Sequence, residues 1–420
     1  MAKLADALGL GPSAHKAWRF KSSPRHQIEK IYMQKRFDTI VLGLGAMGSS
    51  AVYQLAKRGN TVLGIDQFSP PHVFGSSHGD SRIVRQAIGE GEHYTPLSLR
   101  SYEIWREIEK EVGKKFLEIT GGLVISSPTK IVKNHVENFF ENTVAAAKKF
   151  SIKHEILDAD QIRKRFPQFN VHDDEKGYYE YNAGFIRPEK CISTQILLAE
   201  KYGATIRKNE KVEKFLEKDG IVHVKTNQGD YEAKKLIISA GPWFPSLIGD
   251  EYAKFFKVIR QVLFWFDVKT FRERFESKNS PIIIWELQGN KNAIYGFPAI
   301  DGENGGVKIA SEQYETTTTA ETVNREVSCD EIKAMYENFV APCFPDLSNK
   351  CIKAVSCLYT VTPDSHFVID THPKFRSIIL ASPCSGHGFK HSAAIGEVLA
   401  QMVIDGKSKI DISSFSIARF

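Results

Sequence analysis

The chain has 420 residues, of which 42% are hydrophobic and 25% are charged. This composition is typical of a globular protein, and the length allows two domains. The net charge of +6 comes entirely from residues 1–36, so the remainder is neutral. We therefore expect no nucleic-acid partner. The apolar runs are too short to span a bilayer, which excludes a membrane-spanning protein.

Residues 1–36 are basic and lack the long apolar segment of a secretory signal. One interpretation is an expression leader, with Met33 as the natural start, or a disordered extension. The other interpretation is an organellar transit peptide. We expect the former, and hence a cytoplasmic protein. The six cysteines show no CxxC spacing, and the histidines complete no zinc pattern. We expect free thiols and no bound metal.

From Phe37 the hydrophobic pattern predicts strand, glycine turn, helix and strand, with later elements of both kinds. Strands are expected at 39–42 and 61–65, and helices at 49–58, 98–112, 131–150 and about 390–405. Further strands are expected at 221–226, 235–239, 258–266, 281–286, 293–297, 306–310 and 377–382. The strand-rich stretch from about 255 to 310 indicates a second domain built on a mixed or antiparallel sheet.

A glycine-rich loop follows the first predicted strand. Gly43, Gly45 and Gly48 form GxGxxG before a helix, and Asp66 ends the second strand eighteen residues later. The first glycine allows the tight turn, the second the approach of a pyrophosphate, and the third close packing of helix and strand. Asp66 can then accept hydrogen bonds from a ribose. The pattern predicts dinucleotide binding, without separating FAD from NAD.

Longer blocks carry a resemblance to a known family. They are GSSHGDSRIVR at 75–85, GEGEHY at 89–94, CLYTVTPDSHFVID at 357–370 and SGHGFK at 385–390. In this order, from about Phe37 to Phe420, they resemble the monomeric sarcosine oxidase and N-methyltryptophan oxidase family of flavoenzymes. The resemblance implies an α/β protein with a glutathione-reductase-type FAD-binding domain on a parallel sheet and a catalytic domain on a mixed β-sheet. FAD binding is assigned to 37–115, 180–250 and 350–420, and the substrate domain to 116–179 and 251–349.

The resemblance also implies the cofactor and its partners. FAD is expected to be attached covalently through the thioether of Cys357, which by residue type alone is one of six free thiols. Ser76, Ser81, Gly386, His387 and Gly388 are expected beside the cofactor, where a helix N-terminus favours negative charge. The Ser385–Lys390 segment is otherwise a simple strand-to-helix turn. The protein is expected to be a monomer.

Several residues are candidates for the chemistry. Arg82 and Arg85 are three apart, which on a helical turn places them on one face, either as a solvated basic surface or as an anion site. The resemblance implies that Arg85 and Lys390 bind a substrate carboxylate while Arg82 lies by the flavin. It places Lys308 over the flavin, where its charge assists oxygen reduction. His78 and Tyr359 match positions near flavin and substrate, although each also suits packing.

The expected reaction is oxidation of a secondary amino acid, such as an N-methyl amino acid, with molecular oxygen reduced to hydrogen peroxide. Alternatives are oxidation of a cyclic amino acid, a dehydrogenase with another electron acceptor, and a non-catalytic flavin-binding module. The chain departs from the family at three positions. Ser77 stands where histidine is common and Ser81 where threonine is common, and the most important departure is Glu312, which also stands where histidine is common. Glu312 leaves the identity of the amino acid open, because an acid there either favours a larger or more cationic substrate or points away.

Overall fold

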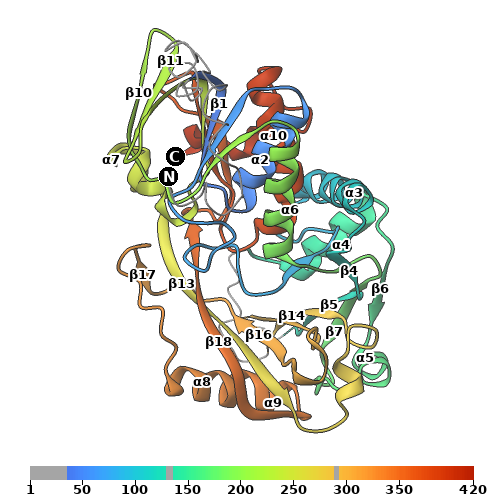
Figure 1. Ribbon diagram of the computed structural model, residues 1–420. Coiled ribbons are helices and arrows are strands. Elements are labelled where there is room, and N and C mark those ends of the chain that lie inside the picture. Colours follow the sequence, from blue (N-terminus) through green and yellow to red (C-terminus); the bar gives the residue numbers. More distant parts are fainter. Residues whose placement is uncertain (1–35, 129–135, 288–292) are drawn as a thin grey trace, which may run out of the picture. The chain divides into compact units, whose positions relative to one another are not determined.

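Three stretches of the chain, residues 36–128, 136–287 and 293–420, are described by the computed structural model in Figure 1. The predictions for residues 1–35 and for the beginning of the helix expected at 131–150 lie outside these stretches. Residues Phe37–Phe420 form a single unit, and the account that follows concerns this unit.

The first sheet carries the glycine loop. Its strands β1 and β2 run parallel, as do β2 with β9 and β12 with β20, whereas β10, β11 and β12 are antiparallel. Buried Ile, Val and Leu side chains fill the parallel centre, as expected for a sheet covered on both faces. The strands are β1 (Arg36–Leu42), β2 (Val62–Ile65), β9 (Thr205–Arg207), β10 (Val212–Lys218), β11 (Ile221–Thr226), β12 (Asp230–Ile238), β19 (Val368–Thr371) and β20 (Ile378–Ser382).

Helix α2 (Ala46–Lys57) is packed between α6 (Pro188–Lys201) and α10 (Ser392–Ile404), and α3 (Thr95–Val112) lies against α10 (Figure 1). Small residues permit this close packing, since a Cβ on Gly396 of α10 would lie 2.1 Å from the Ser50 hydroxyl of α2. The other helices are α4 (Phe139–Lys149), α5 (Ala159–Arg165), α7 (Asp250–Ala253), α8 (Cys329–Met335) and α9 (Ala341–Cys343).

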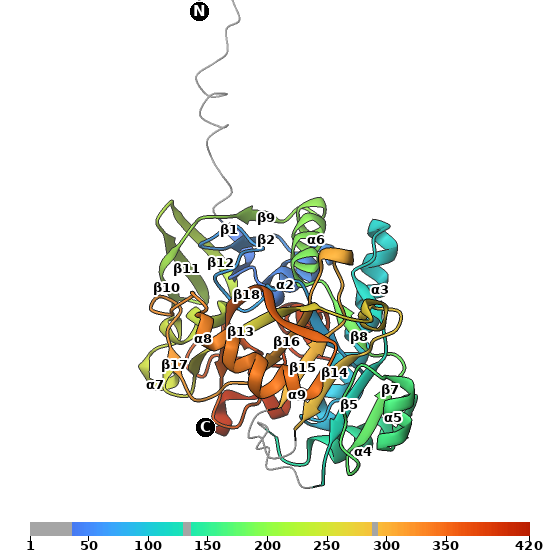
Figure 2. The ribbon, with the colours of Figure 1, turned by 90° about the horizontal axis from the view of Figure 1, so that it is seen from below.

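The second sheet is mixed. Figure 2 shows its long strands β13 and β18 side by side, with α8 and α9 against β18. The strands are β5 (Gly122–Ser126), β6 (His154–Leu157), β7 (Lys176–Glu180), β13 (Lys257–Val268), β14 (Ile282–Glu286), β15 (Ile294–Phe297), β16 (Val307–Ser311), β17 (Thr317–Thr318) and β18 (Leu347–Val361). A small sheet joins β3 (Arg82–Val84), β8 (Gly184–Ile186) and β4 (Leu117–Ile119).

The α/β class and the mixed second sheet are confirmed. One local prediction is wrong, because Arg82 and Arg85 do not share a helical turn. Residues Arg82–Val84 form β3, in which β-branched Ile83 and Val84 pair with β8. The domain boundaries stay a prediction. Within the described stretches, no helix is both long and apolar enough to cross a membrane.

Candidate active site

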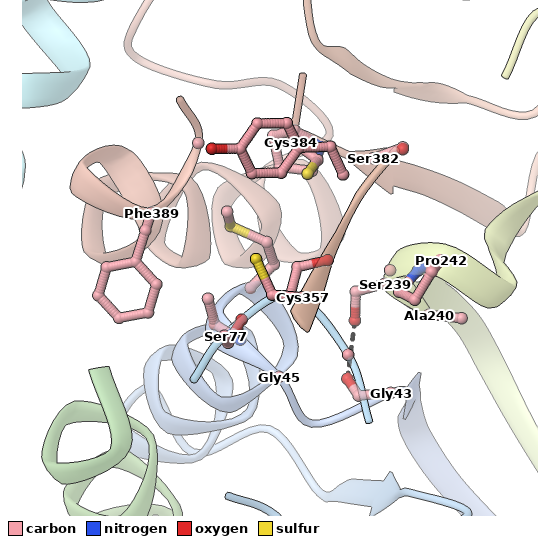
Figure 3. Close-up of a pocket in the computed structure, with 18 of the residues that line it drawn as sticks. Gly43, Gly45, Ser77, Ser239, Ala240, Pro242, Cys357, Ser382, Cys384 and Phe389 are labelled. Atoms are coloured by element: carbon pink, nitrogen blue, oxygen red, sulfur yellow. Dashed lines mark hydrogen bonds between the residues drawn. The ribbon is translucent and has the colours of Figure 1, made fainter. Parts of the chain in front are cut away.

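The glycine loop between β1 and α2 is built so that two of its positions accept no side chain. Gly43 has a φ of +88°, and a Cβ there would lie 2.7 Å from the carbonyl oxygen of Ser239. A Cβ on Gly48 would lie 1.7 Å from the Gly43 carbonyl oxygen. The Ser239 hydroxyl donates to that carbonyl at 2.9 Å, as drawn in Figure 3. The loop is therefore fixed by its own backbone.

Asp66 holds the same loop from the end of β2. Its carboxylate accepts hydrogen bonds from the backbone N–H groups of Leu44 at 2.7 Å and Phe68 at 2.8 Å. Burial raises the pKa of Asp66, and these two donors oppose the rise. The side chain also lines the cavity, so it can meet a ribose while it fixes the turn.

The residues around the loop fit a dinucleotide. Gly45 is the N-cap of α2 and offers no side-chain acceptor, so the positive end of the helix faces the cavity. A Cβ on Gly45 would meet nothing closer than the Ser77 hydroxyl at 3.7 Å, which leaves room for a ligand. Among the described residues, the hydroxyls of Ser76 and Ser382 line the cavity without a hydrogen-bond partner. Such buried groups suit a polar cofactor.

One cavity runs from this loop to the second sheet. In Figure 3, Gly43, Gly45 and Ser77 lie in the lower part of the view and Ser382 and Cys384 in the upper part, with Cys357 between them; all six line the cavity. Cys357 lies on β18 opposite Gln261 of β13, and its side chain is 1% exposed. Burial raises the pKa of the Cys357 thiol, while Arg82 and Lys308 favour the thiolate. The cysteine therefore faces the space in which the resemblance places a flavin.

Tyr359 follows Cys357 on the same face of β18. Its hydroxyl lies 3.2 Å from the hydroxyl of Tyr295 on β15, and both side chains line the cavity. Burial raises the pKa of both phenols, so they stay neutral. Tyr295 was missed by the sequence analysis, in which only the strand that carries it was predicted.

Lys308 lies under the cavity wall. Its ammonium donates to the carbonyl oxygens of Gly79 and Ser81, both at 2.8 Å, and to the Ser81 hydroxyl at 3.3 Å. It also lies 4.4 Å from the ring centroid of Phe297. Burial lowers the pKa of Lys308, and the positive charge of Arg82 adds to this. The lysine is thus held beside the Gly79–Ser81 backbone, behind the residues that line the cavity.

His78 and Arg82 lie close to Lys308. Burial lowers the pKa of His78 to about 3, helped by the charges of Arg82 and Lys308, so its ring is neutral. Arg82 lines the cavity and donates to the carbonyl oxygens of Ser76 and Ser81, each at 2.8 Å. These contacts fix the guanidinium in place.

Arg85 and Lys390, the residues expected to bind a substrate carboxylate, lie on the same carboxylate group, that of Glu90. Arg85 donates to Glu90, and the Lys390 ammonium lies 3.3 Å from the same carboxylate. All three side chains are at most 6% exposed and line the cavity. Burial lowers the pKa of Lys390 to about 8, against the opposing charge of Glu90. Glu90 is not among the predicted site residues, although it lies in the GEGEHY block at 89–94 that carries the resemblance.

The Ser385–Lys390 segment closes the cavity between β20 and α10. Gly386 has a φ of +86°, and a Cβ on Gly388 would lie 1.8 Å from the Pro383 carbonyl oxygen. His387 is 8% exposed, and its backbone carbonyl accepts from Lys390 at 2.8 Å. The structure thus brings together the predicted residues from both ends of the chain, although Ser81, His78 and Lys308 lie behind the wall. Their roles stay predictions.

A family comparison agrees with this geometry. The model of the FAD dependent oxidoreductase family matches residues 38–402. A helix N-terminus for a pyrophosphate, on a parallel sheet beside a second mixed sheet, is what such a protein requires. The chain belongs to the family of FAD dependent oxidoreductases.

Within that family the chain is similar to oxidases of N-methyl amino acids. The monomeric sarcosine oxidase of Streptomyces avermitilis is 38% identical over 388 residues, which cover 92% of this chain and 98% of the relative. The N-methyl-L-tryptophan oxidase of Escherichia coli K12 is 33% identical over 389 residues, covering 92% and 100%.

Solved structures show the same fold at lower identity. NikD, described as an unusual amino acid oxidase of nikkomycin biosynthesis, matches with a TM-score of 0.77 at 20% identity, covering 91% of this chain and 98% of NikD. The L-proline dehydrogenase of P. horikoshii matches with a TM-score of 0.76 at 20% identity, covering 92% and 98%.

Proposed function

We propose that this protein oxidises a secondary amino acid, such as sarcosine or another N-methyl amino acid, and passes the electrons to molecular oxygen. The buried cluster of Arg85, Glu90 and Lys390 carries the proposal. Two cations that share one carboxylate at the wall of a cavity form a site for the carboxylate of a ligand. The relatives named for sarcosine and N-methyl-L-tryptophan support the same substrate class.

The chain contributes orientation to this reaction. A substrate carboxylate that shares or takes the place of Glu90 is held by Arg85 and Lys390 in a buried site. The amine and its N-methyl carbon then extend toward the face that carries Cys357 and Tyr359. Fixing the reacting carbon in this way supplies much of the rate enhancement.

FAD would be held by the glycine loop, Asp66, Ser76 and the Gly386–Gly388 segment, with Cys357 as the site of a covalent thioether link. When bound, FAD supplies the two-electron acceptor that oxidises the amine to an imine and is reoxidised by oxygen with release of hydrogen peroxide. The positive charge of Lys308 stabilises the negative charge that develops on oxygen. A monomeric state and a cytoplasmic location stay predictions.

The holoenzyme is tested by hydrogen peroxide release with sarcosine, N-methyl-L-tryptophan and L-pipecolate, with formaldehyde measured in parallel. Peroxide and formaldehyde from an N-methyl amino acid are the expected result. Peroxide from L-pipecolate alone would mean that the substrate is a cyclic secondary amino acid and would exclude an N-methyl amino acid. Anaerobic dye reduction without peroxide in air would identify a dehydrogenase, and no reduction of FAD by any of these compounds would refute the proposal.

A further inference from the structure

Glu312 directly follows strand β16 of the second sheet, and its side chain lines the cavity. Strand β16 pairs Lys308 with Trp265 on one side and Phe297 on the other. Side chains two residues apart share a face, so Lys308, Ala310 and Glu312 point the same way, with about 13 Å between the first and the last. The backbone N–H of Glu312 donates to the Ala293 carbonyl at 3.2 Å, which continues the pairing with β15.

The side chain of Glu312 lines the cavity and does not point away from it. Tyr295 is paired with Ala310, midway between Lys308 and Glu312, and its hydroxyl contacts that of Tyr359. Glu312 itself lines the same cavity as both tyrosines. The sequence leaves open whether this acid points toward the site, and its position in the lining of the cavity answers the question.

The neighbours of Glu312 show which part of the cavity it serves. Burial raises the pKa values of Tyr295, Tyr314 and Tyr359, and in each case the negative charge of Glu312 adds to the rise. Burial lowers the pKa of Lys390, and Glu312 is among the acids that oppose this. A Cβ on Gly386 would lie 2.9 Å from the Tyr359 ring and 3.2 Å from the Tyr314 hydroxyl, so the chain just beyond Glu312 approaches the segment that carries Lys390. Glu312 lines the same cavity as the carboxylate clamp.

Among the described residues, charges of both signs line this part of the cavity. Arg85 and Lys390 supply two positive charges, and Glu90 and Glu312 supply two negative charges. Tyr295, Tyr314 and Tyr359, whose pKa values Glu312 raises, are neutral phenols. Separated positive and negative groups are complementary to a zwitterion, whereas an amino acid with an uncharged amine carries a net negative charge and offers no cation to Glu312.

We propose that Glu312 binds the secondary ammonium group of the substrate, so that the protein takes its amino acid as a zwitterion, with the carboxylate on Arg85 and Lys390. This inference rests on the proposed function, which it deepens by naming the charge state that the site selects. Glu312 is a specificity-determining residue in this assignment. The phenols of Tyr295 and Tyr359 form the uncharged surface between the two ionic contacts.

Two ligands of equal shape test the inference in the holoenzyme. N,N,N-trimethylglycine carries a carboxylate and a permanent cation, whereas 3,3-dimethylbutanoate has carbon in place of the nitrogen. Their dissociation constants are measured by flavin absorbance and by thermal shift, neither of which depends on turnover. In Glu312→Gln we expect N,N,N-trimethylglycine to bind about tenfold more weakly, and 3,3-dimethylbutanoate to change by less than about twofold.

Matched variants separate charge from structure. Glu312→Asp keeps the carboxylate and is expected to retain most of the preference for N,N,N-trimethylglycine. The exposed Glu315, three residues later, provides the control, and Glu315→Gln is expected to leave both dissociation constants unchanged. A second readout is the ratio of kcat/KM between wild type and Glu312→Gln. This ratio should fall toward one as the pH rises through the pKa of the substrate amine.

Equal weakening of both ligands, or of neither, in Glu312→Gln would overturn the inference. So would a Glu312→Gln effect confined to N-methyl-L-lysine as compared with N-methyl-L-norleucine, because Glu312 would then bind a side-chain cation. Failure of the proposed function looks different. In that case no secondary amino acid is oxidised, while the two non-reacting ligands still report whether Glu312 binds a cation next to a carboxylate.

Discussion

Replacing Glu90 by glutamine removes the carboxylate that Arg85 and Lys390 share. The three side chains are at most 6% exposed, so neither cation gains water in exchange. Leaving one partner of a buried ion pair uncompensated costs about 3–5 kcal/mol. Glutamine keeps the shape and one carbonyl acceptor, so we expect the lower end, about 3 kcal/mol of the free energy of unfolding. For a unit of this length that equals a fall in Tm of about 4 °C.

The same change should improve the site for an external carboxylate. In the wild-type protein the carboxylate of a ligand competes with Glu90 for Arg85 and Lys390. In Glu90→Gln this competing negative charge is absent. We expect acetate to bind at least about tenfold more tightly to the variant. At about one hundred times its Kd, acetate stabilises by about 2.7 kcal/mol, which restores most of the lost stability.

Thermal unfolding of the holoenzyme, with and without acetate, measures both effects. Glu92→Gln is the matched control two residues away, because the Glu92–Lys149 pair at 2.8 Å is more than half exposed on both sides. That pair should contribute less than about 1 kcal/mol. If Glu90→Gln is as stable as wild type, or if acetate binds it no more tightly, the cluster is not a carboxylate site and the reasoning is refuted.

Three further predictions concern other parts of the site. Acid denaturation should leave yellow colour on the wild-type precipitate and release it from Cys357→Ala; colour in the wild-type supernatant would contradict the covalent link. Lys308→Met should keep FAD and its anaerobic reduction by substrate but slow reoxidation by oxygen about hundredfold or more. The control is Lys353→Met, which removes a half-exposed cation over the ring of Trp265; equal effects of the two variants would refute a specific role. Because burial lowers the pKa of Lys390 to about 8, KM for a carboxylate substrate should rise as the pH passes through about 8, and Lys390→Arg should abolish the rise. Deprotonation of Lys390 in the folded state also means that its contribution to stability increases between about pH 8 and about pH 10.4, where the unfolded chain binds the extra proton.

The glycine loop was predictable because its chemistry is local. A strand, a turn without side chains, a helix N-terminus and an acid at the end of the next strand all fall between Phe37 and Asp66. Each part is required by the geometry of the turn or by its neighbour in the chain. Distant segments add further contacts, such as those of Ser239 with Leu42 and Gly43 and of Ser77 with Ala46.

The carboxylate site was only half predictable. Arg85 and Lys390 were expected from the family blocks. The role of Glu90 follows only from its contact with Lys390, which is 300 residues away. The spacing of Arg82 and Arg85 also misled, because pairing with β8, about one hundred residues later, turns this segment into a strand. Strand β18 was not predicted at all, since its first half carries Ser, Asn and Lys and is held by its partner β13. Tertiary pairing overrides local preference in each case.

The two ionic contacts proposed for the substrate come from different parts of the fold, and this has a consequence for specificity. Arg85 follows β3 and Lys390 precedes α10, whereas Glu312 extends from β16 of the second sheet. The distance between the carboxylate and ammonium contacts is therefore set by how the second sheet meets the Ser385–Lys390 segment. An α-amino acid separates these charges by two bonds, and a β-amino acid separates them by three. A site rigid at both ends should therefore discriminate against N-methyl-β-alanine relative to sarcosine, although both are zwitterions with an N-methyl group. Comparable kcat/KM values for the two would show that only one of the contacts is fixed.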